Sequence, residues 1–158
     1  MLSRSCFVLA ACALLAINPA QAEEPRATEA EAQAMVGKAV ALLKARGPDV
    51  AYKSFTEHPD GAFKDRDLYV FVYDFGGTCL AQGANPKMVG KNLLAITDVD
   101  GKAFIKGMVT MVQSSGKGWY GPYKFARPDG KGYEEKKSYC ERGVGDTMVC
   151  AGIYVAAK

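Results

Sequence analysis

Apolar and polar residues alternate along this chain with two different periods, and the period changes from segment to segment. Between residues 29 and 46 the apolar positions fall three or four apart: Met35, Ala39, Leu42 and Leu43. This spacing predicts an amphipathic helix, which Gly47 and Pro48 should end. We interpret its apolar stripe as packing on the protein's own sheet; a partner helix or a dimer interface is the alternative.

A period of two follows at 68–74 and predicts a strand whose faces differ in chemistry. One face is aliphatic and the other aromatic: Leu68, Val70 and Val72 against Tyr69, Phe71 and Tyr73. The aliphatic face suits contact with the helix, whereas phenolic hydroxyls suit the wall of a pocket. Gly76 and Gly77 predict a turn into a second strand at 78–82.

The rest of the chain predicts a long excursion and then three more strands. Helical spacing returns at 103–113, a third strand covers about 119–125, and a turn at 127–132 leads into a closing hairpin. A hairpin turn centred on Gly145 sets three pairs opposite each other: Cys140 with Cys150, Ser138 with Gly152, and Lys136 with Tyr154. The pattern predicts an α+β domain with a five-stranded antiparallel sheet. The long helix should lie on one face and the excursion over the other.

The first 22 residues have the features of an export signal. Arg4 precedes an apolar run, and Ala20, Gln21 and Ala22 form a small-residue cleavage pattern. The run is too short to span a bilayer. We therefore expect cleavage after Ala22 and a periplasmic or secreted protein; acylation of Cys12 as a lipoprotein is the less favoured alternative.

The charge balance argues against nucleic acid as a partner. The formal net charge is +3, which falls to +2 when Arg4 leaves with the leader. Such a weak excess, without a basic cluster among aromatic residues, is not typical of nucleic-acid binding. Small acidic molecules stay compatible with it.

Four groups of residues, in this order and spacing, resemble the type 2 single Cache domain family. They are Asp60, Gly61, Phe63, Asp67 and Leu68; Asn85, Pro86, Val89, Gly90, Lys91, Asn92 and Leu93; Gly118, Trp119 and Tyr123; and Lys136, Ser138, Tyr139, Gly152, Ile153 and Tyr154. The resemblance implies a PAS-like, extracytoplasmic sensor domain at 35–158, after a polar lead-in and helix start at 23–34. Two features depart from the family: Gln82 stands where many members carry histidine, and an additional residue near Gly121 and Pro122 suggests a bulge.

A pocket for a small carboxylate needs a cation, a few hydrogen-bond donors and an apolar wall. Cross-strand pairing and the family topology favour Lys136 as the anion partner; the alternative is a solvated charge at a strand edge. Tyr69 and Tyr73 are candidate donors, although strand tyrosines also serve in packing. Trp119 is a candidate apolar cover, or equally a core residue. The remaining candidates for the pocket are Phe71, Gln82, Tyr123 and Tyr154.

Three cysteines follow the leader: Cys79, Cys140 and Cys150. Opposition across the hairpin suggests a disulfide between Cys140 and Cys150, with two buried free thiols as the alternative. Cys79 leaves open a thiol-based redox protein as a minor hypothesis.

Catalysis, a metal site and a bound cofactor are not expected. His58 is the sole histidine and lies in a turn-like EHPDG segment, and no HExxH or GxSxG motif is present. Three scattered cysteines and one histidine are too few donors for a metal site.

These patterns predict a free-standing, secreted Cache domain that binds a small organic anion such as a carboxylate. It would act through a separate membrane receptor or kinase, with a homodimer through the N-terminal helix as a further expectation. The alternative is a periplasmic interaction or structural module whose pocket is filled by its own side chains.

Overall fold

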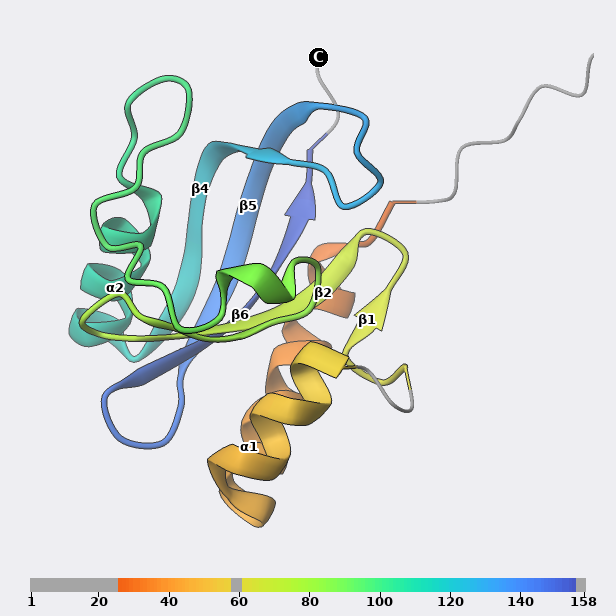
Figure 1. Cartoon of the computed structure of the whole chain (residues 1–158), viewed down its shortest axis with the longest axis vertical. Coiled ribbons are helices and arrows are strands. Elements are labelled where there is room, and N and C mark those ends of the chain that lie inside the picture. Colours follow the sequence, from red (N-terminus) through yellow and green to blue (C-terminus); the bar gives the residue numbers. More distant parts are fainter. Residues whose placement is uncertain (1–25, 58–60, 156–158) are drawn as a thin grey trace, which may run out of the picture.

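The computed structural model describes residues 26–57 and 61–155. The elements in chain order are α1 (Glu29–Glu57), β1 (Lys64–Asp65), β2 (Leu68–Asp74), β3 (Cys79–Gln82), the 3-10 helix η1 (Pro86–Met88), α2 (Phe104–Ser115), β4 (Lys117–Ala126), β5 (Tyr133–Arg142) and β6 (Thr147–Tyr154). The strands form one antiparallel sheet in the order β1-β2-β6-β5-β4, and β3 also pairs with β2. Helix α1 packs on one face, and α2 with the excursion covers the other (Figure 1). The predicted α+β architecture is confirmed, with the short β1 as an addition.

Helix α1 begins with a capping box and consists of two helical segments joined by a kink. The Thr28 hydroxyl accepts a hydrogen bond from the Glu31 backbone N–H, and the Glu31 carboxylate accepts one from the Thr28 backbone N–H. Gly47 has a non-helical backbone and ends the first helical segment, as the sequence predicts. Gly47 has φ 76° and makes a kink, after which Pro48 starts a second helical segment that reaches Glu57. Proline is tolerated in a first helical turn, where its missing N–H has no partner to lose.

The two faces of β2 separate as predicted. Leu68, Val70 and Val72 join the core cluster under α1. Tyr69, Phe71 and Tyr73 join the cluster under α2. Because α1 packs on one face of β2 and α2 with the excursion packs on the other, both of its faces are buried. The aromatic face is therefore enclosed between the sheet and the excursion.

The register of the closing hairpin is also as predicted. Lys136 pairs with Tyr154, and Cys140 pairs with Cys150. Between β4 and β5 the register shifts between Tyr120 and Tyr123, which confirms the expected bulge. Tyr120 lies opposite Ser138 and Tyr123 opposite Lys136. Because the bulge adds one residue, these two tyrosines, three positions apart, point to the same face.

Candidate functional site

Lys136 carries a positive charge into the interior of the domain. Only 1% of the residue is exposed, and its ammonium group donates a hydrogen bond of 2.7 Å to the Tyr69 hydroxyl. Aromatic rings surround the ammonium group: its nitrogen lies 4.0 Å from the ring centre of Tyr69, 4.7 Å from Tyr154, 5.2 Å from Phe125 and 5.6 Å from Phe71. The ring faces attract the cation but supply no negative charge to neutralise it.

No carboxylate pairs with this lysine in the described part of the chain. Burial lowers the pKa of Lys136 to about 7, and the charge of Asp67 opposes this effect without reversing it. A buried cation without a paired anion costs free energy, and ionisable groups with strongly shifted pKa values cluster at functional sites. The charged form would be stabilised by any anion that reaches it.

The aromatic face of β2 and the inner side of α2 enclose a small space, here called the inner cavity. Ten residues line it: Tyr69, Phe71, Tyr73, Gln82, Phe104, Ile105, Met108, Tyr123, Phe125 and Lys136. Its volume is about 10 Å³. That is room for about one water molecule, so aromatic side chains fill most of this space.

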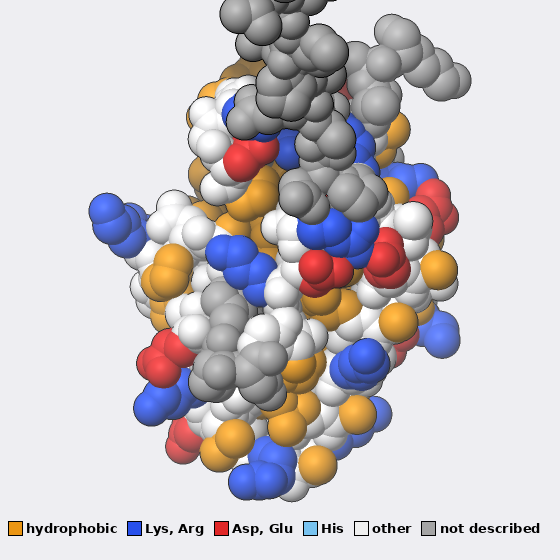
Figure 2. Space-filling model, turned by 90° about the vertical axis from the view of Figure 1, so that its right-hand side faces the viewer, with side chains coloured by type: hydrophobic (Ala, Val, Ile, Leu, Met, Phe, Trp, Pro, Cys, Tyr) orange, Lys and Arg blue, Asp and Glu red, His pale blue; other side chains and the backbone are white. Residues whose placement is uncertain are grey.

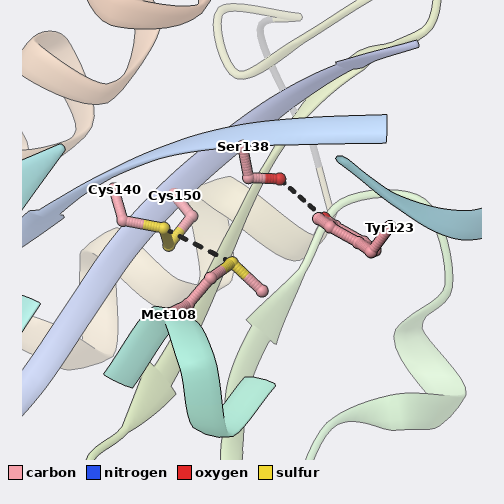
Figure 3. Close-up of a disulfide and its surroundings, with 5 residues drawn as sticks. All are labelled: Met108, Tyr123, Ser138, Cys140 and Cys150. Atoms are coloured by element: carbon pink, nitrogen blue, oxygen red, sulfur yellow. Dashed lines mark hydrogen bonds between the residues drawn. A yellow bond between two sulfur atoms is a disulfide. The ribbon is translucent and has the colours of Figure 1, made fainter. Parts of the chain in front are cut away.

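The predicted disulfide contacts Met108, one of the residues that line the inner cavity. Cys140 and Cys150 are bonded at an S–S distance of 2.08 Å. The Cys140 sulfur lies 3.6 Å from the sulfur of Met108 on α2, and the Tyr123 and Ser138 hydroxyls share a hydrogen bond of 2.6 Å (Figure 3). These contacts fix α2 and β4 against β5 and β6. They leave the ring of Tyr123 as a wall of the cavity.

Tyr73 and Gln82 line the far end of the inner cavity, close to the free thiol of Cys79. Burial raises the pKa of Tyr73, and it raises the pKa of Cys79 to about 11. The Gln82 amide oxygen accepts a hydrogen bond of 3.2 Å from the Ala84 backbone N–H. Gln82 therefore helps to hold the start of the excursion. A fully buried, protonated thiol is poorly suited to redox chemistry.

Two predicted pocket residues lie elsewhere. Trp119 is on the opposite face of the sheet, where it packs against Tyr139 with ring centres 5.5 Å apart. The proposal that Trp119 covers the pocket is therefore wrong, because its place in β4 before the bulge points it toward α1. Tyr154 contacts Lys136 but does not line the cavity, and its hydroxyl donates a hydrogen bond of 2.6 Å to the Ala126 carbonyl.

A larger hollow, here called the outer cleft, lies beside the inner cavity. Its volume is about 410 Å³. Segment 88–99 of the excursion forms one wall, and residues 124–126 of β4 with Phe104 form the other. Phe104 and Phe125 line both spaces. Ring-to-ring contact between them, at 5.7 Å and nearly perpendicular, separates the cavity from the cleft.

Polar residues of the excursion mainly hold its backbone in place. The Asn85 side chain accepts a hydrogen bond from the Lys87 backbone N–H. The Asn92 side chain accepts one from the Leu94 N–H and donates one of 2.8 Å to the Gly76 carbonyl. Together they tie the cover of the site to the turn before β3.

Sequence reasoning missed several residues of the site. The sequence predicts Ser138 only as the partner of Gly152 across the hairpin and as a family-matched position, yet its hydroxyl shares a hydrogen bond with the Tyr123 hydroxyl. Phe104, Ile105 and Met108 had been assigned to a helix without a role in the pocket. Their shared apolar stripe was the available signal, because a helix that covers an aromatic sheet face must line any space between them.

Charges on the surface are dispersed. Figure 2 shows Lys and Arg side chains standing apart on one face, several of them beside Asp or Glu. Arg66, for example, contacts the carboxylates of Glu31 and Asp65.

Among residues 26–57 and 61–155, no cluster of His, Cys, Asp and Glu gathers the three donors that a metal ion would need. No helix in these ranges has both the length and the apolar character for a membrane span. His58 and the expected leader lie outside the described residues.

Comparison with solved structures finds the same fold in bacterial chemoreceptors. A methyl-accepting chemotaxis protein from Vibrio parahaemolyticus is 24% identical, with a TM-score of 0.64 over 79% of this chain and 86% of that chain. A periplasmic sensor domain of a chemotaxis protein is 22% identical, with a TM-score of 0.62 over 78% of this chain and 88% of the other. A Cache chemosensory domain described for its carboxylic acid recognition is 23% identical, with a TM-score of 0.67 over 80% of this chain and 92% of that chain.

Sequence comparisons define the family more directly. No curated protein matches this chain. The sequence pattern described as single Cache domain 2, in contrast, matches residues 8–155, which is most of the chain. The fold, with its sheet between one long helix and a covering excursion, agrees with that match. The protein belongs to the single Cache domain 2 family.

Proposed function

We propose that this protein is an extracytoplasmic sensor-type domain that binds a small organic anion, most simply a carboxylate, without catalysing a reaction. The observation that carries the proposal is the buried ammonium group of Lys136, which has aromatic neighbours and no carboxylate partner among the described residues. Ligand carboxylate oxygens would complete its coordination, with the Tyr69 hydroxyl as a further donor. Carboxylic acid recognition by a Cache domain of the same fold supports this choice of ligand.

Export to the periplasm belongs to the same proposal. Residues 1–22 form the leader, with cleavage after Ala22, and 35–158 form the sensor domain. Binding would be passed to a separate membrane receptor or kinase. A homodimer through α1 would have to use its outer, polar face, because its apolar stripe is buried against the sheet.

A second candidate function is an interaction module whose pocket is filled by its own side chains. The small volume of the inner cavity, about 10 Å³, favours this candidate. Under it, Lys136 would serve only to orient Tyr69 and its neighbours. The two candidates differ in whether an anion stabilises the fold.

Thermal unfolding in the presence of carboxylates, amino acids and amines tests the proposal. An anion that binds the folded protein should raise the melting temperature progressively with its concentration. The shift should vanish in Lys136→Met and persist in Lys117→Met, which changes an exposed lysine. Absence of a shift with every anion, or an equal shift in both variants, would support the filled module instead.

A further inference from the structure

The inner cavity is too small for even a short organic acid beside Lys136. It holds about 10 Å³, whereas the adjoining outer cleft holds about 410 Å³. Binding sites for small molecules usually have volumes of roughly 300 to 1,000 Å³, so of these two spaces the outer cleft is the one of this size. A ligand that reaches the lysine must therefore keep most of its atoms in the cleft.

Two aromatic rings in contact, those of Phe104 and Phe125, lie between the two spaces. Phe125 lines both, and its ring centre lies 5.2 Å from the Lys136 ammonium nitrogen. Phe125 is only partly buried and contacts Phe104 by its edge. For a ligand in the cleft to contact the ammonium group, the Phe125 side chain would have to change its rotamer.

The cleft has an apolar lining whose polar groups are largely engaged already. The Asp98 carboxylate accepts backbone hydrogen bonds from Lys102 and Lys124, and the Lys124 ammonium lies 3.2 Å from the Asp100 carboxylate. Leu93, Ile96 and Val99 contribute apolar side chains. Ile96 is 38% exposed and Val99 is 65% exposed, which leaves apolar area that a ligand could cover.

Building on the proposed function, we propose that the outer cleft holds the apolar chain of an organic acid whose carboxylate reaches Lys136. The preferred ligand is thus an amphiphilic monocarboxylate rather than a two-carbon or three-carbon acid. The ammonium group of Lys136 selects ligands with a carboxylate, and the outer cleft selects ligands with an apolar chain. Lys91, on the cleft wall, offers the competing choice of a second carboxylate.

Calorimetric titration with acetate, butyrate, hexanoate and octanoate tests the proposal. Affinity should rise about fourfold per added methylene while the chain stays inside the cleft, since each buried methylene contributes about 0.8 kcal/mol. Hexylamine should not bind, because it carries the wrong charge. Adipate, which has a second carboxylate in place of the terminal methyl group, should bind more weakly than hexanoate.

Substitutions in the outer cleft, with a matched control elsewhere, test whether the apolar chain of the ligand lies there. Ile96→Asn should weaken hexanoate binding about tenfold and leave acetate unchanged, and Val99→Asn, at a more exposed position, should do the same to a smaller degree. Val144→Asn, at a 46% exposed position of the β5–β6 turn, is the control and should have no effect.

Other outcomes separate this proposal from the proposed function. If acetate bound as tightly as hexanoate, or adipate more tightly than hexanoate, the ligand's apolar chain would not lie in the outer cleft. The proposed anion site at Lys136 would be unaffected by that result. Hexanoate binding that survives Lys136→Met would also overturn this proposal, because the cleft would then be a nonspecific apolar surface. Failure of every acid to bind would remove both proposals together.

Discussion

Asp67 is the acidic residue whose charge acts on Lys136, yet the two form no salt bridge. One carboxylate oxygen of Asp67 accepts a hydrogen bond of 3.0 Å from the Ala27 backbone N–H, and the other is buried without a partner in the described structure. Asp67 thus ties the start of α1 to the sheet. The lysine is left with aromatic neighbours, and its charge becomes sensitive to pH.

The first prediction concerns stability as a function of pH. Burial holds the pKa of Lys136 at about 7 in the folded protein, below its ordinary 10.5. Between these values the unfolded chain binds more protons, so stability should rise with pH across this window. From pH 6.5 to 8.5 the gain should be about 2 kcal/mol in the free energy of unfolding, measured by urea denaturation.

Lys136→Met is the control for this dependence. The variant should be more stable than the parent at pH 6.5, because it removes an unpaired buried charge, and the difference should shrink toward pH 8.5. Parallel curves for the two proteins would show that another group causes the dependence. Lys117→Met, on the surface, should follow the parent.

The second prediction concerns the sole tryptophan. Trp119 packs on Tyr139 under α1, whereas the inner cavity is on the other face of the sheet. Trp119→Phe should therefore leave carboxylate affinity within about twofold of the parent, because substitutions away from a site usually act weakly. In the parent protein, the fluorescence maximum of Trp119 should not move when ligand is added. A large change in either quantity would mean that binding rearranges β4.

Local sequence signals were sufficient for much of the fold. The alternation of Tyr69, Phe71 and Tyr73 assigned their face, and the Gly145 turn set Lys136 opposite Tyr154. Both follow from the period of two in a strand, which is a local property. The disulfide follows from the same register.

Features that depend on contacts between residues far apart in the sequence could not be predicted from local patterns. Ala51 and Phe55 are buried in the second helical segment of α1, after the kink at Gly47, and their packing in the core holds that segment in place. Local signals at Gly47 and Pro48 predict the end of the first segment but not how the second one packs. The face of Trp119 depends on where the bulge falls. The narrowness of the inner cavity depends on how Phe104 and Phe125 pack, which no periodicity encodes.

The third prediction concerns Cys140 and Cys150. Their bond closes a loop with a sequence separation of 10, so loss of both sulfurs should cost about 2 to 3 kcal/mol in the free energy of unfolding. We expect Cys140→Ala/Cys150→Ala to fold with a lower melting temperature and weaker carboxylate binding, because Met108, which lines the cavity, loses its contact with the Cys140 sulfur. Alkylation of the unfolded, unreduced parent should label Cys79 and neither of the other two. Labelling of all three would exclude the disulfide.

The fourth prediction concerns Gly152, which lies opposite Ser138 on β6. A Cβ atom at this position would stand less than 3.0 Å from the Ser138 hydroxyl oxygen and from Cε of Lys136. The Lys136 side chain thus lies directly over the glycine, and it reaches Tyr69 only because no side chain is there. Gly152→Ala should displace the ammonium group.

Crowding at this point should cost about 1 to 3 kcal/mol of stability and reduce anion affinity about tenfold or more. Gly37→Ala is the matched control, because Gly37 lies on the exposed side of α1 with no atom within 4 Å of the added Cβ. It should stabilise the helix by about 1 kcal/mol without changing affinity. Denaturant titration and calorimetry of both variants measure these effects. Unchanged anion binding in Gly152→Ala would show that the ammonium group need not cross β6 at this position to hold the ligand.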